Sequence, residues 1–518
     1  MAVPQTISQL VDAVAAAWPN ELACVDGERR VTFAELRRDI VQAAAALAAS
    51  DVGKDDAIAL WGPNTLEWLT VALGAAYVGA RVVPLNTRYR ADEAADILYR
   101  SRATVLFTVN GFLGYDYVSA LRASEIALPQ LRTTVLLRGN AEDDRAMALD
   151  AFLRRAGSLP DVEVTGDDIS HIQYTSGTTG RAKGAMLCHG AMVGTTREWI
   201  ANVELGRGDR YLIVSPFFHI SGHKTGILAC LTAGATIYPQ AVFDPVAVMQ
   251  RVQDERITVL PGPPTIYQAL LEHPRLREFD LSSLQLAVTG AASIPAVLIG
   301  RMFDELGFDR VISAYGITET TGVVTMCRPG DDRDTIASTS GRAVSGVEIK
   351  IAPTRGGEQT DPATGEILVR GYNVMRGYLD DPVATSEAID DAGWFHSGDV
   401  GRLDDAGNLR ITDRIKDLYI VGGFNVYPAE IEALLLTHEA VAAVAVVGVP
   451  DERMGEIGVA FVVARQPVDD GELIAWCRER LANFKVPRRV QFVDALPVNA
   501  SGKVTKFELR ARAGSAEK

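Results

Sequence analysis

Tyr174-Thr175-Ser176-Gly177-Thr178-Thr179-Gly180-Arg181-Ala182-Lys183-Gly184 combines hydroxyl side chains, glycines and two cations between two apolar runs. Glycines let a backbone curl with its N–H groups pointing inward, and hydroxyls add further donors. Lys183 adds a point charge suited to a phosphate. The segment therefore predicts a polyphosphate-binding loop, although it is not a Walker A loop, because no Gly-Lys-Ser/Thr follows. On composition alone, an ordinary Ser/Thr/Gly-rich surface turn is the competing interpretation.

The composition predicts a protein of more than one domain, because 518 residues are too many for one small core. A net charge of −15 argues against nucleic-acid binding and against docking on an anionic membrane. The five cysteines are scattered without a CxxC pair, which favours a reducing, cytoplasmic setting over disulfides or zinc. The N-terminus is not typical of a signal peptide, and the uncharged run 225–243 contains glycines and a proline, so no stable membrane insertion is expected.

Strand-like and helical runs alternate over most of the chain. An amphipathic helix is expected over 7–18, and Thr32 with Glu35 predicts a capping box that opens a second helix. Strand-like runs follow at 57–61, 82–85, 104–109 and 133–137, with helical runs at 65–78, 91–100 and 117–124. A second series of strands lies at 211–214, 236–239, 258–260, 284–289 and 311–313. This alternation indicates an α/β fold with doubly wound, largely parallel sheets.

The pattern changes beyond about residue 340. Short strands at 347–351, 365–370, 400–403 and 408–411 predict a small antiparallel or barrel-like unit. An α+β segment follows, with a helix over 428–436, a strand over 441–447 and a helix over 470–481. We place a domain boundary at 413–417, which gives an N-terminal domain over 1–413 and a smaller C-terminal domain over 414–518.

Five motifs, in order, resemble those of the adenylate-forming superfamily, which includes acyl-CoA synthetases, luciferases and peptide-synthetase adenylation domains. They are Tyr174–Gly184, Tyr315–Thr320, Gly393–Asp399, the stretch from Asp413 to Glu432, and Pro497–Lys503. The resemblance spans residues from about 30 to about 510. It implies an AMP-forming acyl-CoA ligase, in which a carboxylic acid and ATP give acyl-AMP and pyrophosphate, and coenzyme A then gives acyl-CoA and AMP. The implied cofactors are ATP, Mg²⁺ and coenzyme A.

The resemblance also implies roles for individual residues. Attack of a carboxylate on the α-phosphate brings two anions together, and a hard cation bridging phosphates usually takes one or two protein carboxylates. The implied catalytic residues are Lys503, Glu319, Thr175 and His219, with Glu319 as the magnesium ligand. The implied nucleotide- and coenzyme-binding residues are Ser176, Gly177, Thr178, Thr179, Lys183, Gly290, Ala291, Ala292, Tyr315, Gly316, Thr318, Asp399, Arg414, Lys416, Gly422 and Gly423. Tyr315 offers a face for adenine, and the Asp399 carboxylate can accept both ribose hydroxyls.

A mobile C-terminal domain follows from the same resemblance. After adenylate forms, the domain is expected to swing about Lys416, which withdraws Lys503 and brings the loop 422–425 to the channel for the pantetheine thiol. An activated intermediate of this kind splits one difficult step into two. His219 occupies the family's aromatic-or-His position near the carboxylate and thiol, although a packed histidine is the alternative.

The segments 218–225, 289–293 and 315–323 would line the acyl pocket by resemblance, which makes His223, Lys224 and Gly322 substrate-binding candidates. An alkyl tunnel has no need of Lys224, because burying an unpaired ammonium is costly. If the Lys224 side chain points inward, it suggests a keto or second anionic group on the substrate. If it points outward, it says nothing about the substrate.

Several substrates and acceptors stay open. The runs 217–231, 258–268 and 279–284 look like an actinobacterial group of acyl-CoA ligases, one of which activates a bicyclic dione-propanoate derived from sterol rings. A medium or long fatty acid and an aryl acid of coumarate type are the alternatives. Free coenzyme A is the expected acceptor, because a peptide-synthetase module would continue into a carrier domain. An adenylating enzyme that loads a carrier protein and a non-catalytic adenylate-binding homologue are the competing functions, and homo-oligomerisation is left open.

Overall fold

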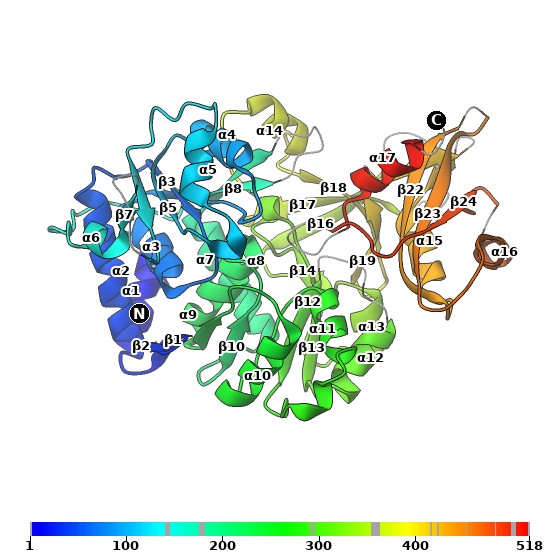
Figure 1. Cartoon of the computed structure of the whole chain (residues 1–518), viewed down its shortest axis with the longest axis horizontal. Coiled ribbons are helices and arrows are strands. Elements are labelled where there is room, and N and C mark those ends of the chain that lie inside the picture. The colour runs from blue at the N-terminus through cyan, green and yellow to red at the C-terminus, as the bar shows by residue number, and fades with distance from the viewer. Residues whose placement is uncertain are drawn as a thin grey trace.

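The computed structural model describes residues 3–139, 146–175, 182–290, 294, 296–353, 363–414, 417–421, 424–451, 453–481, 483–498 and 504–515. Three sheets and their helices form a large N-terminal part, and a smaller α+β part lies beside it at the C-terminal end (Figure 1). The α/β fold with a large N-terminal and a smaller C-terminal unit is therefore confirmed.

A seven-stranded sheet holds the stems of the predicted phosphate loop. Its strands are β3 (Ala57–Trp61), β4 (Arg81–Pro84), β5 (Ala103–Thr108), β6 (Thr133–Leu136), β7 (Met147–Ala148), β8 (Ile169–Thr175) and β9 (Lys183–Cys188), in the order β7-β6-β5-β3-β4-β8-β9. Every pair is parallel except the β8–β9 hairpin. The accompanying helices are α2 (Phe33–Ala48), α3 (Leu66–Ala75), α4 (Ala91–Ser101), α5 (Tyr117–Ala123) and α6 (Leu149–Leu153).

The first two helices begin as their sequences predict. Thr6 caps α1 (Ile7–Ala17), where its side chain accepts a hydrogen bond from the Gln9 backbone. At the start of α2, Thr32 N donates to Glu35 Oε2 at 2.9 Å and Thr32 Oγ1 accepts from Glu35 N at 3.3 Å. The reciprocal pair is the predicted capping box, which satisfies backbone donors that the first helical turn leaves unpaired.

A second long sheet is joined through one residue. It contains β2 (Arg29–Thr32), β1 (Leu22–Asp26), β11 (Thr236–Pro239) and β10 (Arg210–Ile213), then β12 (Leu286–Gly290), β13 (Arg310–Tyr315), β14 (Thr325–Met326) and β15 (Arg342–Ala343). Between β10 and β12, Val259 forms isolated bridges to Tyr211 and Leu286. The predicted strand at 258–260 is thus reduced to a bridge, because Pro261, Pro263 and Pro264 follow and proline has no N–H for a ladder.

The α-helices and the π-helix between β9 and β13 in the chain include the predicted acyl-pocket segment. They are α7 (His189–Val203), α8 (Ile220–Gly222), the π-helix η2 (His223–Leu228), α9 (Ala229–Ala233), α10 (Pro245–Glu255), α11 (Pro264–Leu271) and α12 (Ala296–Asp304). Within this segment, Thr225 Oγ1 donates a hydrogen bond to Ser221 O at 2.6 Å. A π-helix inside an α-helical run is uncommon and is found often at functional sites.

The rest of the chain is antiparallel and α+β. The third sheet runs β16 (Val347–Ala352), β17 (Gly365–Gly371), β18 (Phe395–Leu403) and β19 (Leu409–Arg414), all antiparallel. The C-terminal part contains β20 (Tyr419–Val421), β21 (Phe424–Val426), α15 (Pro428–Leu435), β22 (Val441–Asp451), β23 (Gly455–Ala464), α16 (Asp470–Arg480), β24 (Arg489–Phe492) and α17 (Lys506–Ser515).

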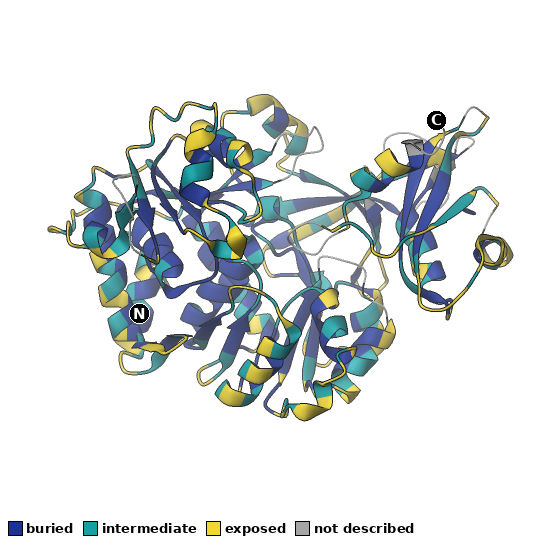
Figure 2. Ribbon diagram, in the orientation of Figure 1, coloured by how far each residue is buried: buried dark blue, intermediate teal, exposed yellow. Residues whose placement is uncertain are grey.

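The buried residues form separate cores (Figure 2). One large cluster runs from Ile7 to Leu409 and fills the N-terminal part. Two further clusters, one with Tyr419 and Ile431 and one with Phe461 and Leu509, pack in the C-terminal part. None of the helices in the described ranges combines the length and the apolar character that crossing a membrane requires.

Three of the buried histidines lead us to expect a fold that is sensitive to acid. His171, His189 and His223 are at most 2% exposed. Burial lowers the pKa of His189 to about 4 and that of His223 to about 3, and burial also lowers the pKa of His171 well below its ordinary value. Each histidine is therefore neutral in the folded protein at pH values where the unfolded chain binds a proton.

We expect the free energy of unfolding to fall as the pH drops below about 6.5, the ordinary pKa of histidine. Each buried histidine adds up to about 1.4 kcal/mol per pH unit to this slope, until the pH reaches its folded pKa. Urea unfolding between pH 7 and pH 5 measures the slope. His223→Asn should reduce this slope by about the contribution of one histidine. The matched control His273→Asn changes a partly exposed histidine and should leave the slope intact. A slope that His223→Asn does not alter would contradict the assignment.

Candidate active site

The hairpin β8–β9 brings the two ends of the predicted phosphate loop together. Thr175, the last residue of β8, is the Cα partner of Lys183, the first residue of β9. Both side chains are partly exposed at the mouth of the hairpin. The intervening predicted residues Ser176, Gly177, Thr178 and Thr179 lie outside the described residues. The hairpin thus places a hydroxyl and a lysine that are eight positions apart in the chain opposite each other.

Glu319 lies against the first stem of this loop. It sits in the short helix η4 (Thr318–Thr320), directly after Thr318. Its Oε1 accepts hydrogen bonds from Thr175 Oγ1 at 3.1 Å and from the Tyr378 hydroxyl at 3.1 Å. Both hydrogen bonds fall on the same carboxylate oxygen. The backbone is held as well, because Met375 N donates to Glu319 O at 2.8 Å.

Tyr378 is a site residue that the sequence did not reveal. Its hydroxyl donates to Glu319, and Lys183 Nζ lies 5.2 Å from the centre of its ring. Burial and the adjacent Glu319 charge raise the pKa of Tyr378, which keeps the hydroxyl protonated as a donor. Backbone hydrogen bonds from Leu379 N to Gly184 O and from Met186 N to Gly377 O pair this segment with β9. Such long-range pairing leaves no local signal in the sequence.

Tyr315 and Asp399 meet across two sheets. Tyr315 ends β13 and Asp399 lies in β18, and the Tyr315 hydroxyl donates to Asp399 Oδ2 at 2.7 Å. The two residues are 7% and 4% exposed, so the hydrogen bond is formed away from bulk water. Arg414, at the end of β19, is the Cα partner of Asp399, and its side chain lies outside the described part of the chain.

The glycines of the predicted adenine region are required by close backbone contacts. A Cβ on Gly290 would lie 2.2 Å from Ala314 O, and one on Gly316 would lie 2.4 Å from the carbonyl carbon of Gly322. These separations are far shorter than van der Waals contact, so only glycine fits. The neighbouring candidates Ala291 and Ala292 lie outside the described residues, as do Lys416, Gly422, Gly423 and Lys503.

His219 caps the short helix α8. Its Nδ1 accepts from Ser221 N at 3.3 Å and lies 2.7 Å from Ser221 Oγ. The segment is tied to the phosphate-loop sheet, because Gln173 Nε2 donates to Phe218 O at 2.7 Å. His219 is partly exposed, so the ring is not simply packed in the core.

Lys224 points into the protein. Its side chain is 0% exposed, and Nζ has no hydrogen-bond partner among the described residues. The amine lies 5.6 Å from the centre of the Trp199 ring, on α7. Burial lowers the pKa of Lys224 well below its ordinary value, because the charged form loses its hydration. The structure thus excludes the outward orientation that the sequence left open.

The other two substrate-binding candidates occupy different positions. His223 packs its ring 4.4 Å from His171 and 5.7 Å from Trp68, with no hydrogen-bond partner for either nitrogen in the described part of the chain. Gly322 has φ of +76°, and a Cβ there would lie 3.0 Å from Ile220 Cγ1, at the start of α8. Gly322 is therefore beside the helix that carries the pocket segment, whereas His223 faces the seven-stranded sheet.

The hairpin at the predicted phosphate loop, the carboxylate beside it and the buried Tyr315–Asp399 pair fit the class that the sequence predicts, a nucleotide-dependent enzyme with an α/β fold. Comparison with known proteins gives the particular family. The profile of the AMP-binding enzymes matches residues 11–379, and that of the AMP-binding enzyme C-terminal domain matches residues 430–503. The chain belongs to the AMP-binding enzyme family, as an AMP-forming acyl-CoA ligase that uses ATP, Mg²⁺ and coenzyme A.

Two curated relatives match over nearly their whole length. The "3-[(3aS,4S,7aS)-7a-methyl-1,5-dioxo-octahydro-1H-inden-4-yl]propanoyl:CoA ligase" of Mycobacterium tuberculosis is 50% identical over 516 residues, covering 98% of both chains. The enzyme of the same name from Rhodococcus jostii is 50% identical over 518 residues, again covering 98% of both chains.

Solved structures agree with the fold. An anthranilate CoA ligase in complex with anthranoyl-AMP has a TM-score of 0.88 at 26% identity, covering 100% of this chain and 99% of that one. The o-succinylbenzoate CoA synthetase of Bacillus subtilis in complex with ATP and magnesium has a TM-score of 0.81 at 30% identity, covering 97% and 98%.

Proposed function

We propose that this ligase activates a propanoate carried on a keto-bearing fused ring, of the kind derived from sterols, and transfers it to free coenzyme A. The observation that carries the substrate class is the buried amine of Lys224 in the acyl-pocket segment, which has no hydrogen-bond partner among the residues that the structure describes. The two relatives at 50% identity, named for a dioxo-octahydroindenyl propanoate, support the same class.

A ketone would supply what Lys224 lacks. An amine without a hydrogen-bond partner in the interior is costly, and a carbonyl oxygen accepts a hydrogen bond from either the neutral or the charged form. An alkyl chain offers no acceptor, so a fatty acid would leave this cost uncompensated. An aryl acid, the other alternative, would fill the pocket but would not place a carbonyl oxygen at the Lys224 amine. The ring ketone is therefore the group that best accounts for Lys224.

The described part of the site supports the proposed roles in adenylation. Thr175 and Lys183, at the ends of the hairpin, would contact the β- and γ-phosphates together with Ser176 and Thr178. Thr318, beside Glu319, would reach the α-phosphate. Tyr315 would stack on adenine, and Asp399, oriented by the Tyr315 hydroxyl, would accept the ribose hydroxyls. Fixed donors and charges of this kind lower the barrier where negative charge develops.

The residues at Glu319 fit a magnesium ion. The two hydroxyl donors contact Oε1, and the carboxylate has a second oxygen, Oε2, to offer a hard cation. Magnesium prefers oxygen ligands and is commonly held by one or two carboxylates, with substrate phosphates and water completing its shell. When bound, the ion would neutralise charge on the phosphates. Thr175 and Tyr378 would hold the carboxylate in place for it.

We further propose that Lys503 supplies positive charge during adenylation, and that the C-terminal part from residue 414 onward alternates between two positions about Lys416. The separate hydrophobic cores on either side of this boundary support independent movement. A cytoplasmic location is also proposed, because all five cysteines are free and buried.

The proposal is tested with a panel of acids, ATP and magnesium, with and without coenzyme A, following AMP and thioester by mass spectrometry. The panel holds fatty acids of graded length, cinnamate-type acids and fused-ring propanoates with and without ketones. We expect the highest kcat/KM for a ring propanoate that carries ketones. Efficient thioester formation only with fatty or aryl acids would refute the substrate class. Acyl-AMP without any thioester would favour the alternative of a carrier-loading enzyme.

Lys224→Met separates substrate recognition from stability. We expect the variant to lose about tenfold or more in kcat/KM for the keto acid and little for its ketone-free analogue, because one hydrogen bond to an amine is lost. We also expect a higher melting temperature, because an unpaired amine is replaced by an apolar side chain of similar size. The control Lys350→Met changes an exposed lysine and should do neither. An unchanged preference for the ketone would show that Lys224 does not recognise it.

A further inference from the structure

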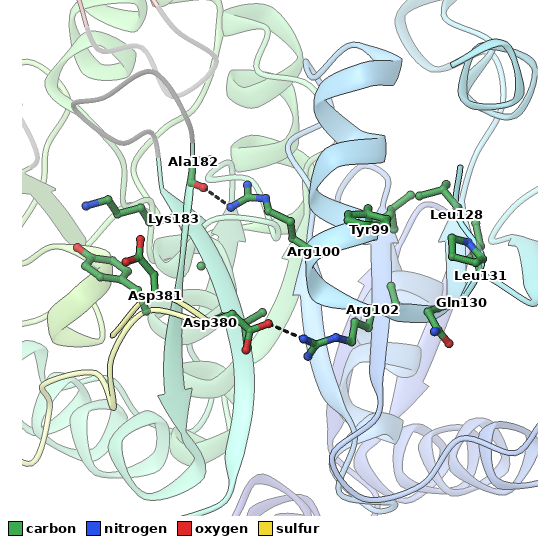
Figure 3. A pocket seen from close by; sticks show the side chains of 16 residues that line it. Tyr99, Arg100, Arg102, Leu128, Gln130, Leu131, Ala182, Lys183, Asp380 and Asp381 are labelled. Carbon is green, nitrogen blue, oxygen red and sulfur yellow. Dashed lines mark hydrogen bonds and ion pairs between the residues drawn. The ribbon is translucent and has the colours of Figure 1, made fainter. Parts of the chain in front are cut away.

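A cavity of about 510 Å³ lies between the end of α4 and the β8–β9 hairpin (Figure 3). Leu98 and Tyr99 of α4, Leu128 and Leu131 line one side, and Lys183 and Asp381 line the other. Two arginines cross the gap, Arg100 toward Ala182 and Arg102 toward Asp380 (Figure 3). Because the two arginines bind different partners, the effects of replacing each of them can be compared.

Arg100 contacts both stems of the phosphate loop. Its Nη1 donates to Ala182 O at 2.8 Å, directly before Lys183. Its guanidinium lies 4.9 Å from the ring centre of Tyr174, two residues before Ser176. A third contact anchors it to its own helix, because Nε donates to Asp96 Oδ2 at 2.9 Å. One side chain on α4 therefore connects the entry and the exit of the loop.

We propose that Arg100 is a positioning residue that holds the two stems of the phosphate loop at the separation that ATP requires. The proposal rests on the proposed role of this loop in binding ATP. A loop with glycines loses much conformational freedom when it is ordered around a phosphate. Contacts that order its stems beforehand reduce that loss at the moment of binding, which raises affinity for the nucleotide.

The chemistry of the contact is specific to arginine. The planar guanidinium stacks on an aromatic face and donates several hydrogen bonds in its own plane at the same time. A lysine has a compact charge and can make either contact but not the same set together. Within the described part of the chain, the neighbouring Arg102 has no such arrangement. It pairs with Asp380, and both side chains are well exposed, at 65% and 57%.

The two half-reactions distinguish a positioning role of Arg100 in ATP binding from a general structural role. Adenylation needs the β- and γ-phosphates of ATP, whereas thioester formation from supplied acyl-AMP and coenzyme A does not. For Arg100→Ala we expect the KM for ATP to rise about tenfold, as for a lost hydrogen bond to a charged group. The KM for the acid and the rate from supplied acyl-AMP should stay within twofold. Arg100→Lys should recover part of the loss.

Arg102→Ala is the matched control, because it removes the other bridge across the same cavity and should leave the KM for ATP unchanged. An ATP KM for Arg100→Ala within twofold of the parent would overturn the proposal, and so would equal losses in the two half-reactions. Should Arg100→Ala unfold, Arg100→Gln keeps a donor for Ala182 without the charge and is measured in the same way. The unmodified enzyme is first tested for formation of acyl-AMP from ATP. If it forms acyl-AMP, an unchanged KM in Arg100→Ala contradicts the role of Arg100 alone. If it does not, the proposed function of the loop has failed.

Discussion

Glu319→Gln is expected to reduce acyl-adenylate formation about 100-fold or more, with a large increase in the magnesium concentration that gives half the maximal rate. The amide keeps the size of the side chain, and it can still accept from Thr175 and Tyr378, but it loses the negative charge that a hard cation prefers. Single-turnover formation of acyl-AMP over a magnesium titration measures the effect.

Two further variants sharpen this result. Glu348→Gln, the matched control, changes an exposed glutamate that pairs with Arg370 on the third sheet, and it should leave adenylation unchanged. Tyr378→Phe removes only one donor to Glu319, so its effect should be smaller than that of Glu319→Gln. An unaltered magnesium dependence in Glu319→Gln would identify a different carboxylate as the ligand.

Lys503→Ala is expected to slow adenylation by about 100- to 1000-fold while leaving thioester formation from supplied acyl-AMP nearly intact. The amine would act on charge that develops only when the carboxylate attacks ATP, and removing one such group commonly costs this much in rate. The two half-reactions are measured separately, by acyl-AMP formed from ATP and by acyl-CoA formed from synthetic acyl-AMP.

The second half-reaction serves as the internal control for folding of the Lys503 variant. If both half-reactions lost activity equally, the C-terminal part would not alternate between two positions as proposed. The Lys503 result also complements the Arg100 test, because both variants are expected to spare the second half-reaction. Only the Arg100 change should act through the KM for ATP, since Arg100 contacts the stems of the loop and not the reacting groups.

Local patterns predicted most of the fold. The capping box of Thr32 and Glu35, the alternation of strands and helices, and the antiparallel strands after residue 347 all depend on neighbours in the chain, and all are present. The expected strand at 258–260 is the exception. Its side chains favour a strand, but the prolines that follow remove the donors that a longer ladder needs, so only Val259 pairs.

The sequence by itself predicted the reaction, because five short motifs, in order along the chain, resemble those of the adenylate-forming superfamily. Only the tertiary structure decided which side chains meet. Strand pairing and packing bring Tyr378 to Glu319 across 59 positions and Thr175 to Glu319 across 144. They also turn Lys224 inward against Trp199 and place Arg100 across both stems of the loop. Contacts of this kind depend on the register of distant elements, and no local periodicity encodes them.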